Sequence, residues 1–130
     1  MPRAPLPREV PMRLRAARGA IRVPSDDGDA LLGSTERLLS AVLQRNEIDP
    51  EDLVSIMFTA TQDLRSAFPA EAARRMGLGL VPLMCAQEIP VEGSMPSVIR
   101  ILVHFHSDRT LDEVAHVYLD GAETLRDDVR

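Results

Sequence analysis

The sequence predicts an α+β fold in which a mixed β-sheet carries helices on one face. Residues 12–23 alternate between apolar or small side chains and charged ones, as half-buried strands do. Residues 30–46 repeat leucines at helical spacing, and residues 53–60 form a nearly continuous apolar run. Further signals give the order strand, helix, strand, helix, strand, strand and a final short strand. This order is typical of a layered α+β domain.

The first element is the strand expected over residues 12–23, which follows a segment with little to bury. Residues 1–11 contain four prolines, and we expect them to form a disordered N-terminal extension to a domain over residues 12–130. Within the strand, Gly19 permits a close backbone approach beside Arg18. Arg18 is therefore the arginine of this strand that we expect at a functional site.

A turn over residues 24–29 supplies serine and aspartate side chains that can cap the following helix. This helix, to about Asn46, is amphipathic, and we interpret it as core scaffolding. A capped helical turn at residues 49–52 has proline at its first position and leads into the buried strand over residues 53–60.

The second half of the chain adds one short helix and three strands. Pro69 opens the helix, which ends near Gly77, and strands follow over residues 80–86 and 98–106. After these come a helical turn at 108–114, a short strand at 116–119 and a last turn at 122–126. The sheet face without helices is too apolar for water, so we expect subunits to pack against it.

Composition limits the function classes. The chain has 130 residues, a net charge of −5 and 3% aromatic residues, which argues against nucleic-acid binding. One cysteine favours a reducing compartment, and no apolar run is long enough for a membrane span, so we expect a cytoplasmic protein without a membrane partner. An acidic protein that binds an anion must gather its arginines in one cleft.

Arg100 interrupts the apolar run of residues 98–103, where a permanent charge needs an anionic partner or a wet cleft. Glu88 lies just before Pro90, where the preceding strand should be ending, and Cys85 lies three residues before it. We interpret these three side chains as facing one small polar pocket. The alternative is a structural ion pair between Glu88 and Arg100, with Cys85 in the core. The three histidines lack metal-ligand spacing, so no metal site is expected.

Three other residues have both a structural and a functional interpretation. Phe68 either staples the chain onto the following helix or forms a pocket wall. Arg74 is either a solvated charge on that helix or part of a site. Tyr118 is either an amphipathic edge residue or a hydroxyl that binds an anion.

Five motifs in order give the chain a family resemblance. They are Arg18-Gly19-Ala20; Ala60-Thr61-Gln62-Asp63-Leu64 with Phe68-Pro69-Ala70 and Arg74; Cys85-Ala86-Gln87-Glu88; Val91-Glu92-Gly93 with Ile99-Arg100; and His116-Val117-Tyr118-Leu119 with Leu125-Arg126. With them the chain resembles the small, trimeric class of chorismate mutase over residues 12–127. The resemblance implies a pseudo-α/β-barrel homotrimer with active sites at subunit interfaces. Glu71, Met84 and Asp127 depart from the family pattern.

The resemblance also implies the reaction and the residues that serve it. Chorismate would rearrange to prephenate in phenylalanine and tyrosine biosynthesis, without a cofactor. The implied catalytic residues are Arg100, Glu88, Arg18 and Cys85. The implied substrate-binding residues are Arg18, Phe68, Ala70, Arg74, Leu83, Met84, Cys85, Glu88, Arg100, Tyr118, Leu125 and Arg126, of which Phe68, Ala70 and Arg74 would come from the neighbouring subunit. Two competing hypotheses are a trimeric enamine or imine deaminase and a non-catalytic module that binds small dicarboxylates.

Overall fold

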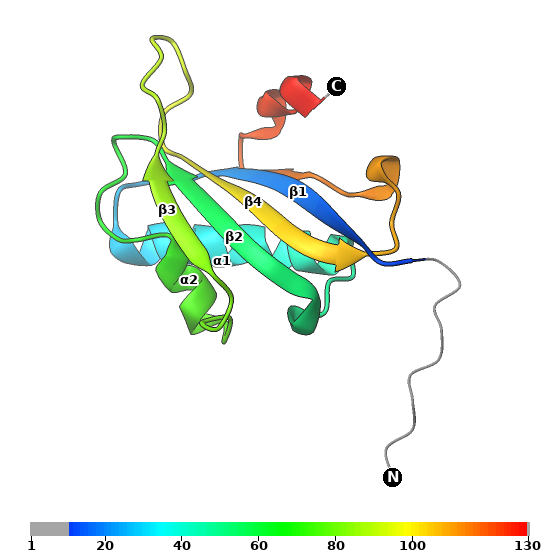
Figure 1. Ribbon diagram of the computed structural model, residues 1–130. Coiled ribbons are helices and arrows are strands. Elements are labelled where there is room, and N and C mark those ends of the chain that lie inside the picture. Colours follow the sequence, from blue (N-terminus) through cyan, green and yellow to red (C-terminus); the bar gives the residue numbers. More distant parts are fainter. Residues whose placement is uncertain (1–10, 130) are drawn as a thin grey trace.

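A computed structural model describes residues 11–129, so the extension expected over residues 1–11 lies almost wholly outside the described residues. The elements agree closely with the expected order (Figure 1). They are β1 (Arg13–Arg22), α1 (Gly28–Arg45), the 3-10 helix η1 (Pro50–Asp52), β2 (Leu53–Ala60), α2 (Ala70–Arg75), β3 (Leu83–Gln87), β4 (Val98–Ser107), η2 (Leu111–Glu113), β5 (Val117–Leu119) and η3 (Glu123–Val129).

The five strands form one mixed sheet in the order β3-β2-β4-β1-β5. The long strand β4 lies in the middle and pairs antiparallel with both β1 and β2 (Figure 1). The outer strands β3 and β5 run parallel to β2 and β1, respectively. The prediction of an α+β fold with a mixed sheet is confirmed.

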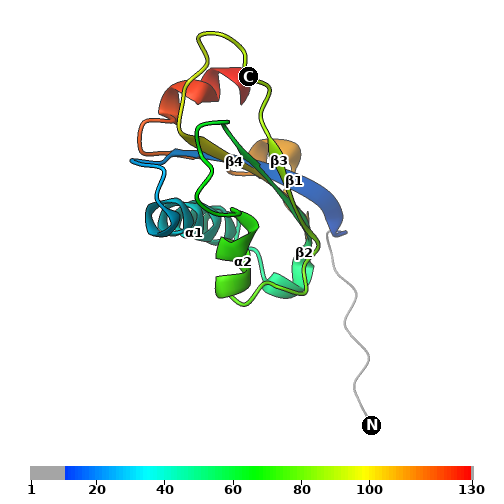
Figure 2. The same ribbon diagram turned by 90° about the vertical axis from the view of Figure 1, so that its left-hand side faces the viewer.

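Both α-helices cover the same face of the sheet (Figure 2). The side chain of Asp27 caps α1 by accepting a hydrogen bond from the backbone N–H of Ala30. On the buried side of this helix, Leu31 and Leu38 are fully buried and belong to the same core cluster as Phe58 of the sheet. Burial of each such side chain contributes about 1.5–3 kcal/mol to folding.

The opposite face of the sheet carries exposed apolar side chains. Leu14, Met57 and Met84 are 55%, 38% and 62% exposed, respectively. On β4, Ile101 is buried beneath the helices, whereas the adjacent Leu102 is only partly buried, as the two-residue period of a strand requires. We call this surface, formed by the side chains of the sheet that point away from α1 and α2, the open face.

The third strand begins later than the sequence predicts. The expected strand covered residues 80–86, whereas β3 starts at Leu83 because turns occupy the preceding positions. Leu80 is fully exposed. Pro82 has no N–H to donate to a sheet, although its carbonyl accepts a hydrogen bond of 3.0 Å from the backbone N–H of Ile56.

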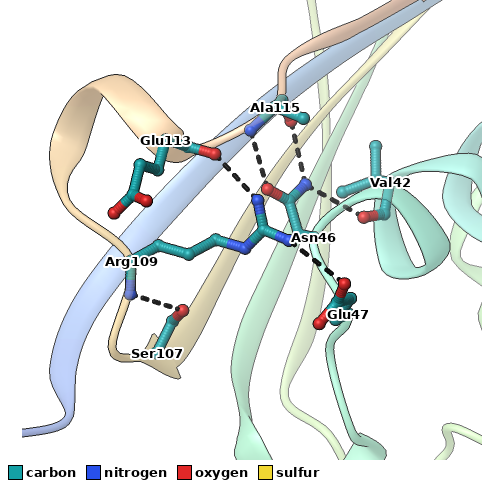
Figure 3. Close-up of polar contacts among 7 residues, drawn as sticks. All are labelled: Val42, Asn46, Glu47, Ser107, Arg109, Glu113 and Ala115. Atoms are coloured by element: carbon teal, nitrogen blue, oxygen red, sulfur yellow. Dashed lines mark hydrogen bonds and ion pairs between the residues drawn. The ribbon is translucent and has the colours of Figure 1, made fainter. Parts of the chain in front are cut away.

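A buried asparagine joins the end of α1 to the segment before β5 (Figure 3). Asn46 is 2% exposed. Its Nδ2 donates to the carbonyls of Val42 at 3.0 Å and Ala115 at 2.9 Å, and its Oδ1 accepts from the N–H of Ala115 at 2.7 Å. Nearby, Arg109 donates to the carbonyl of Glu113 at 2.9 Å. One side chain therefore satisfies both backbone groups of Ala115.

Replacing Asn46 with leucine is expected to lower the free energy of unfolding by about 3 kcal/mol. The substitution leaves the partly buried N–H and carbonyl of Ala115 without the partners described above, at a cost of about 1–3 kcal/mol for each group. Urea unfolding followed by circular dichroism measures the change. The matched control is Gln44→Leu at an exposed position of the same helix, which should change stability by less than about 0.5 kcal/mol. Equal effects of the two substitutions would contradict the structural role of Asn46.

Candidate functional site

A cavity of about 220 Å³ lies on the open face, over β1, β2, β4 and β5. Apolar side chains, two guanidinium groups and two side chains with hydroxyls form its walls. The lining residues are Arg18, Gly19, Ala20, Met57, Thr59, Arg100, Ile101, Leu102 and Tyr118. Three residues that the sequence indicates for a site, Arg18, Arg100 and Tyr118, are thus brought together from three different strands.

The strand register explains this convergence. Arg100 lies between Thr59 of β2 and Ala20 of β1, and Ala20 in turn lies opposite Tyr118 of β5. Arg18 is two residues from Ala20 along β1, so it lies on the same face of the sheet. The arginines and the tyrosine are therefore neighbours on the open face, although they are far apart in sequence.

Arg100 forms an ion pair with Glu88. Its Nε atom lies 3.2 Å from Oε2 of the carboxylate. This buried Nε lacks the directed geometry of a hydrogen bond, so the contact is an ion pair only. The structural ion pair that the sequence left as an alternative is present. Because a guanidinium has five N–H donors, this pair and a role in the cavity wall are compatible.

Glu88 follows β3, at one end of a loop that is fixed to the sheet. The backbone N–H of Glu88 donates to the carbonyl of Ala60 at 2.9 Å. At the other end, Oδ2 of Asp63 accepts from the backbone N–H and the hydroxyl of Ser97, each at 3.0 Å. Hydrogen bonds lower the pKa of Asp63, with the larger effect from the Thr61 hydroxyl and a smaller one from Ser97. The β3–β4 loop is therefore held at both ends, close to Glu88 and to the start of β4.

His116 lies just before β5 and holds the backbone of Arg18 on the neighbouring strand β1. Its Nδ1 atom accepts a hydrogen bond of 2.9 Å from the backbone N–H of Arg18. Burial lowers the pKa of His116, and the positive charges of Arg18 and Arg126 lower it further. The ring must be neutral at Nδ1 to accept this hydrogen bond, so His116 contributes to the placement of Arg18 as an uncharged group.

This arrangement predicts that the protein loses stability as the pH falls below about 6.5, the ordinary pKa of histidine. Because the pKa of His116 is lower in the folded state, the unfolded chain binds the proton more readily, and stability is complete only above the unfolded pKa. The melting midpoint should be constant from about pH 7 to 8 and fall between about pH 6.5 and 5.

The matched control for this prediction is His116→Asn, whose side-chain oxygen can accept the same hydrogen bond but does not titrate. Its melting midpoint should lose most of the dependence on pH in this interval. The same fall in both proteins would assign the effect to another group.

Cys85 lies on the other side of the sheet from the cavity. The register places it opposite Phe58, which is fully buried beneath the helices, and Cys85 packs against the same core cluster. Cys85 does not line this cavity, because alternate side chains of a strand point to opposite faces, and its expected place in a pocket with Glu88 and Arg100 stays a prediction. Leu83, two residues earlier, also packs against the core cluster, whereas Met84 lies on the open face opposite Met57.

The residues around α2 lie on the helix-bearing side and do not line the cavity of their own chain. Phe68 is 76% exposed, which is too exposed to staple the chain onto α2. Ala70 is buried in the core, and Arg74 forms a surface ion pair of 3.1 Å with Glu71. Leu125, in contrast, packs against the small cluster that contains Tyr118, close to the cavity.

Thr59 is a site residue that the sequence analysis does not single out. It lines the cavity, and its hydroxyl donates a hydrogen bond of 2.8 Å to Oε2 of Glu88. The signal that could have found it is the two-residue period, which puts Ser55, Met57 and Thr59 on one face of the strand. A hydroxyl on this face of an apolar strand needs a polar partner.

The chemistry of the site suits an anionic organic molecule. Guanidinium groups can bind carboxylates through paired hydrogen bonds, and the carboxylate of Glu88 can accept from a hydroxyl. Among residues 11–129, no three His, Cys, Asp or Glu side chains are placed to hold a metal ion. Over the same described range, no helix combines the length and apolar character needed to cross a bilayer.

Comparisons with known proteins identify a common family. The family model for chorismate mutase type I matches residues 14–129. The chorismate mutase AroH of Thermus thermophilus is 48% identical over 117 residues, which cover 89% of this chain and 96% of that protein. The AroH of Bacillus subtilis is 37% identical over 119 residues, or 91% and 94% of the two chains. A solved chorismate mutase from Clostridium thermocellum has a TM-score of 0.83 at 41% identity, and the match covers 85% of this chain and 98% of the other.

Proposed function

The chain belongs to the type I chorismate mutase family and is an isomerase that rearranges chorismate to prephenate, and we propose that its open-face cavity is the site of this reaction. The observation that carries this proposal is the convergence of Arg18, Arg100 and Tyr118 on one cavity, with Glu88, which does not itself line the cavity, ion-paired to Arg100. These side chains match the carboxylates and the hydroxyl of the substrate in charge and in hydrogen-bonding capacity.

The reaction is an intramolecular [3,3] rearrangement in which one C–O bond breaks as one C–C bond forms. No nucleophile and no obligatory proton transfer are needed. A protein can accelerate it by holding the enolpyruvyl arm folded over the ring, so that the reacting carbons are already close. It can also stabilise the negative charge that develops on the ether oxygen as the C–O bond stretches.

We assign to Arg100 the stabilisation of the negative charge that develops on the ether oxygen. A fixed cation there binds the polarised transition state more tightly than the ground state, which is the kind of interaction that raises kcat. The ion pair with Glu88 supports this role, because it holds Nε in place while the guanidinium lines the cavity.

The other polar residues are assigned to substrate binding. Arg18 and Tyr118 bind a carboxylate, and Glu88 accepts a hydrogen bond from the ring hydroxyl. Leu125 and Met84 supply apolar walls, and Arg126 adds positive potential. Two further residues, Leu83 and Cys85, reach a ligand from the edge of β3, since this strand ends the sheet and neither side chain is fully buried.

The active enzyme is proposed to be a homotrimer with sites shared between subunits. The open face carries the exposed apolar side chains of Leu14, Met57 and Met84, a pattern that marks subunit interfaces. Phe68 and Arg74 lie on the helix-bearing side, away from the cavity of their own chain. A neighbouring subunit can supply them, together with Ala70, to complete the site.

The single cysteine supports a further proposal, that the enzyme works in the reducing environment of the cytoplasm. Cys85 is a free thiol in the structure. Measurement of one reactive thiol per chain in freshly lysed cells tests this location.

The direct test of the function is to add the purified protein to chorismate and follow the loss of its ultraviolet absorbance. We expect prephenate as the product, in equal amount to the chorismate consumed. Binding of chorismate without turnover would favour a binding module instead. Release of ammonia from imino acids would favour the deaminase hypothesis.

A further inference from the structure

We propose that Thr59 is a positioning residue for the rearrangement, which holds the carboxylate of Glu88 so that Arg100 stays aimed at the cavity. The inference rests on the proposed function of this site. Its basis is the contact of the Glu88 carboxylate with two residues that line the cavity, Thr59 and Arg100.

A hydrogen bond and an ion pair converge on the same oxygen of Glu88. The Thr59 hydroxyl donates to Oε2 at 2.8 Å, and Nε of Arg100 lies 3.2 Å from the same atom. Thr59 and Arg100 are opposite each other in the β2–β4 ladder, so both approach the carboxylate from adjacent strands. Oε1 is then the oxygen that remains to accept a hydrogen bond from the substrate hydroxyl.

The side chain of Thr59 has little conformational freedom, which suits it to holding the Glu88 carboxylate in place. A β-branched side chain on a strand has restricted rotation about χ1, so the position of its hydroxyl oxygen is restricted by the backbone. The side chain of Glu88 is only 18% exposed, which limits replacement of this hydrogen bond by water. Thr59 therefore supplies the hydrogen bond to Oε2, and Arg100 supplies the ion pair.

Removal of the Thr59 hydroxyl changes the position of the Glu88 carboxylate relative to the guanidinium of Arg100. With Arg100 as the remaining partner of Oε2, the carboxylate turns toward the guanidinium and draws it away from the developing charge on the substrate. Thr59→Val keeps the shape of the side chain and removes only the hydroxyl. A hydrogen bond to a charged group is worth enough to change a rate about tenfold or more.

The experiment compares steady-state kinetics of the full-length wild type with Thr59→Val, Thr59→Ser and a matched control. We expect Thr59→Val to lower kcat about tenfold while KM changes less than about threefold, and Thr59→Ser to recover most of kcat. The control is Ser55→Ala on the same face of β2, where the lost hydroxyl contacts Nδ1 of His104, outside the cavity. It should keep wild-type kinetics. Calorimetric titration with prephenate counts competent sites and so separates a lower kcat from partial unfolding.

A double-mutant cycle tests whether Thr59 acts through Glu88. In a Glu88→Ala background, Thr59→Val should change kcat less than about twofold, because the acceptor is already gone. Independent, multiplicative effects of the two substitutions would overturn the proposal, as would wild-type kcat in Thr59→Val alone. If the wild type itself fails to convert chorismate, the proposed function fails, and this outcome is distinct from the failure of Thr59 as a positioning residue.

Discussion

Replacing Arg100 with methionine is expected to lower kcat by at least about a hundredfold while KM changes much less. Methionine is unbranched and flexible like arginine but carries no charge. The loss of one neutral donor that stabilises transition-state charge costs about 3 kcal/mol, and loss of a partly buried cation should cost no less. Stopped-flow or steady-state assays of prephenate formation measure both kinetic parameters.

The asymmetry between kcat and KM is the informative part of this result. An interaction made mainly in the transition state lowers kcat, whereas uniform binding of substrate and transition state would appear in KM. Arg13→Met removes an exposed arginine of β1 and serves as the control, with kinetics expected to equal those of the wild type. A large rise in KM with unchanged kcat for Arg100→Met would reduce Arg100 to a substrate-binding residue.

Mixing two inactive variants is expected to restore activity if the sites are shared between subunits. Arg74→Ala removes the charge proposed to come from the neighbour, and Arg100→Met removes the charge within the cavity. When the two proteins exchange subunits in equal amounts, about one site in four combines an intact Arg100 with an intact Arg74. The mixture should therefore reach about a quarter of the wild-type kcat per site.

Two controls make the mixing experiment decisive. Native mass spectrometry of differently tagged chains verifies that subunits have exchanged. Mixing Arg100→Met with Glu88→Ala supplies two substitutions on the same side of the site, and its hybrid sites each retain one defect. Recovery in this control, or no recovery with Arg74→Ala after verified exchange, would contradict a site completed by the neighbouring subunit.

Part of the site could be predicted because its residues break local patterns. Arg100 interrupts an apolar strand, and Arg18 lies beside a glycine in the strand that becomes β1. The glycine matters because a Cβ at Gly19 would lie 3.1 Å from side-chain atoms of Ile101 and Leu38, so larger residues would crowd the core. Thr59 breaks no such pattern, since a threonine is an ordinary strand residue.

The sequence by itself determined the order and type of the elements, the amphipathic face of α1 and the family of the chain, because periodicity and motifs depend on residues close together in the chain. Only the tertiary structure decided that β4 lies between β1 and β2, that Thr59 meets Glu88, and that Cys85 faces the helices. These facts depend on strand register, and a shift of one residue would turn every side chain of a strand to the other face. Register is fixed by packing between distant segments, which no local pattern specifies.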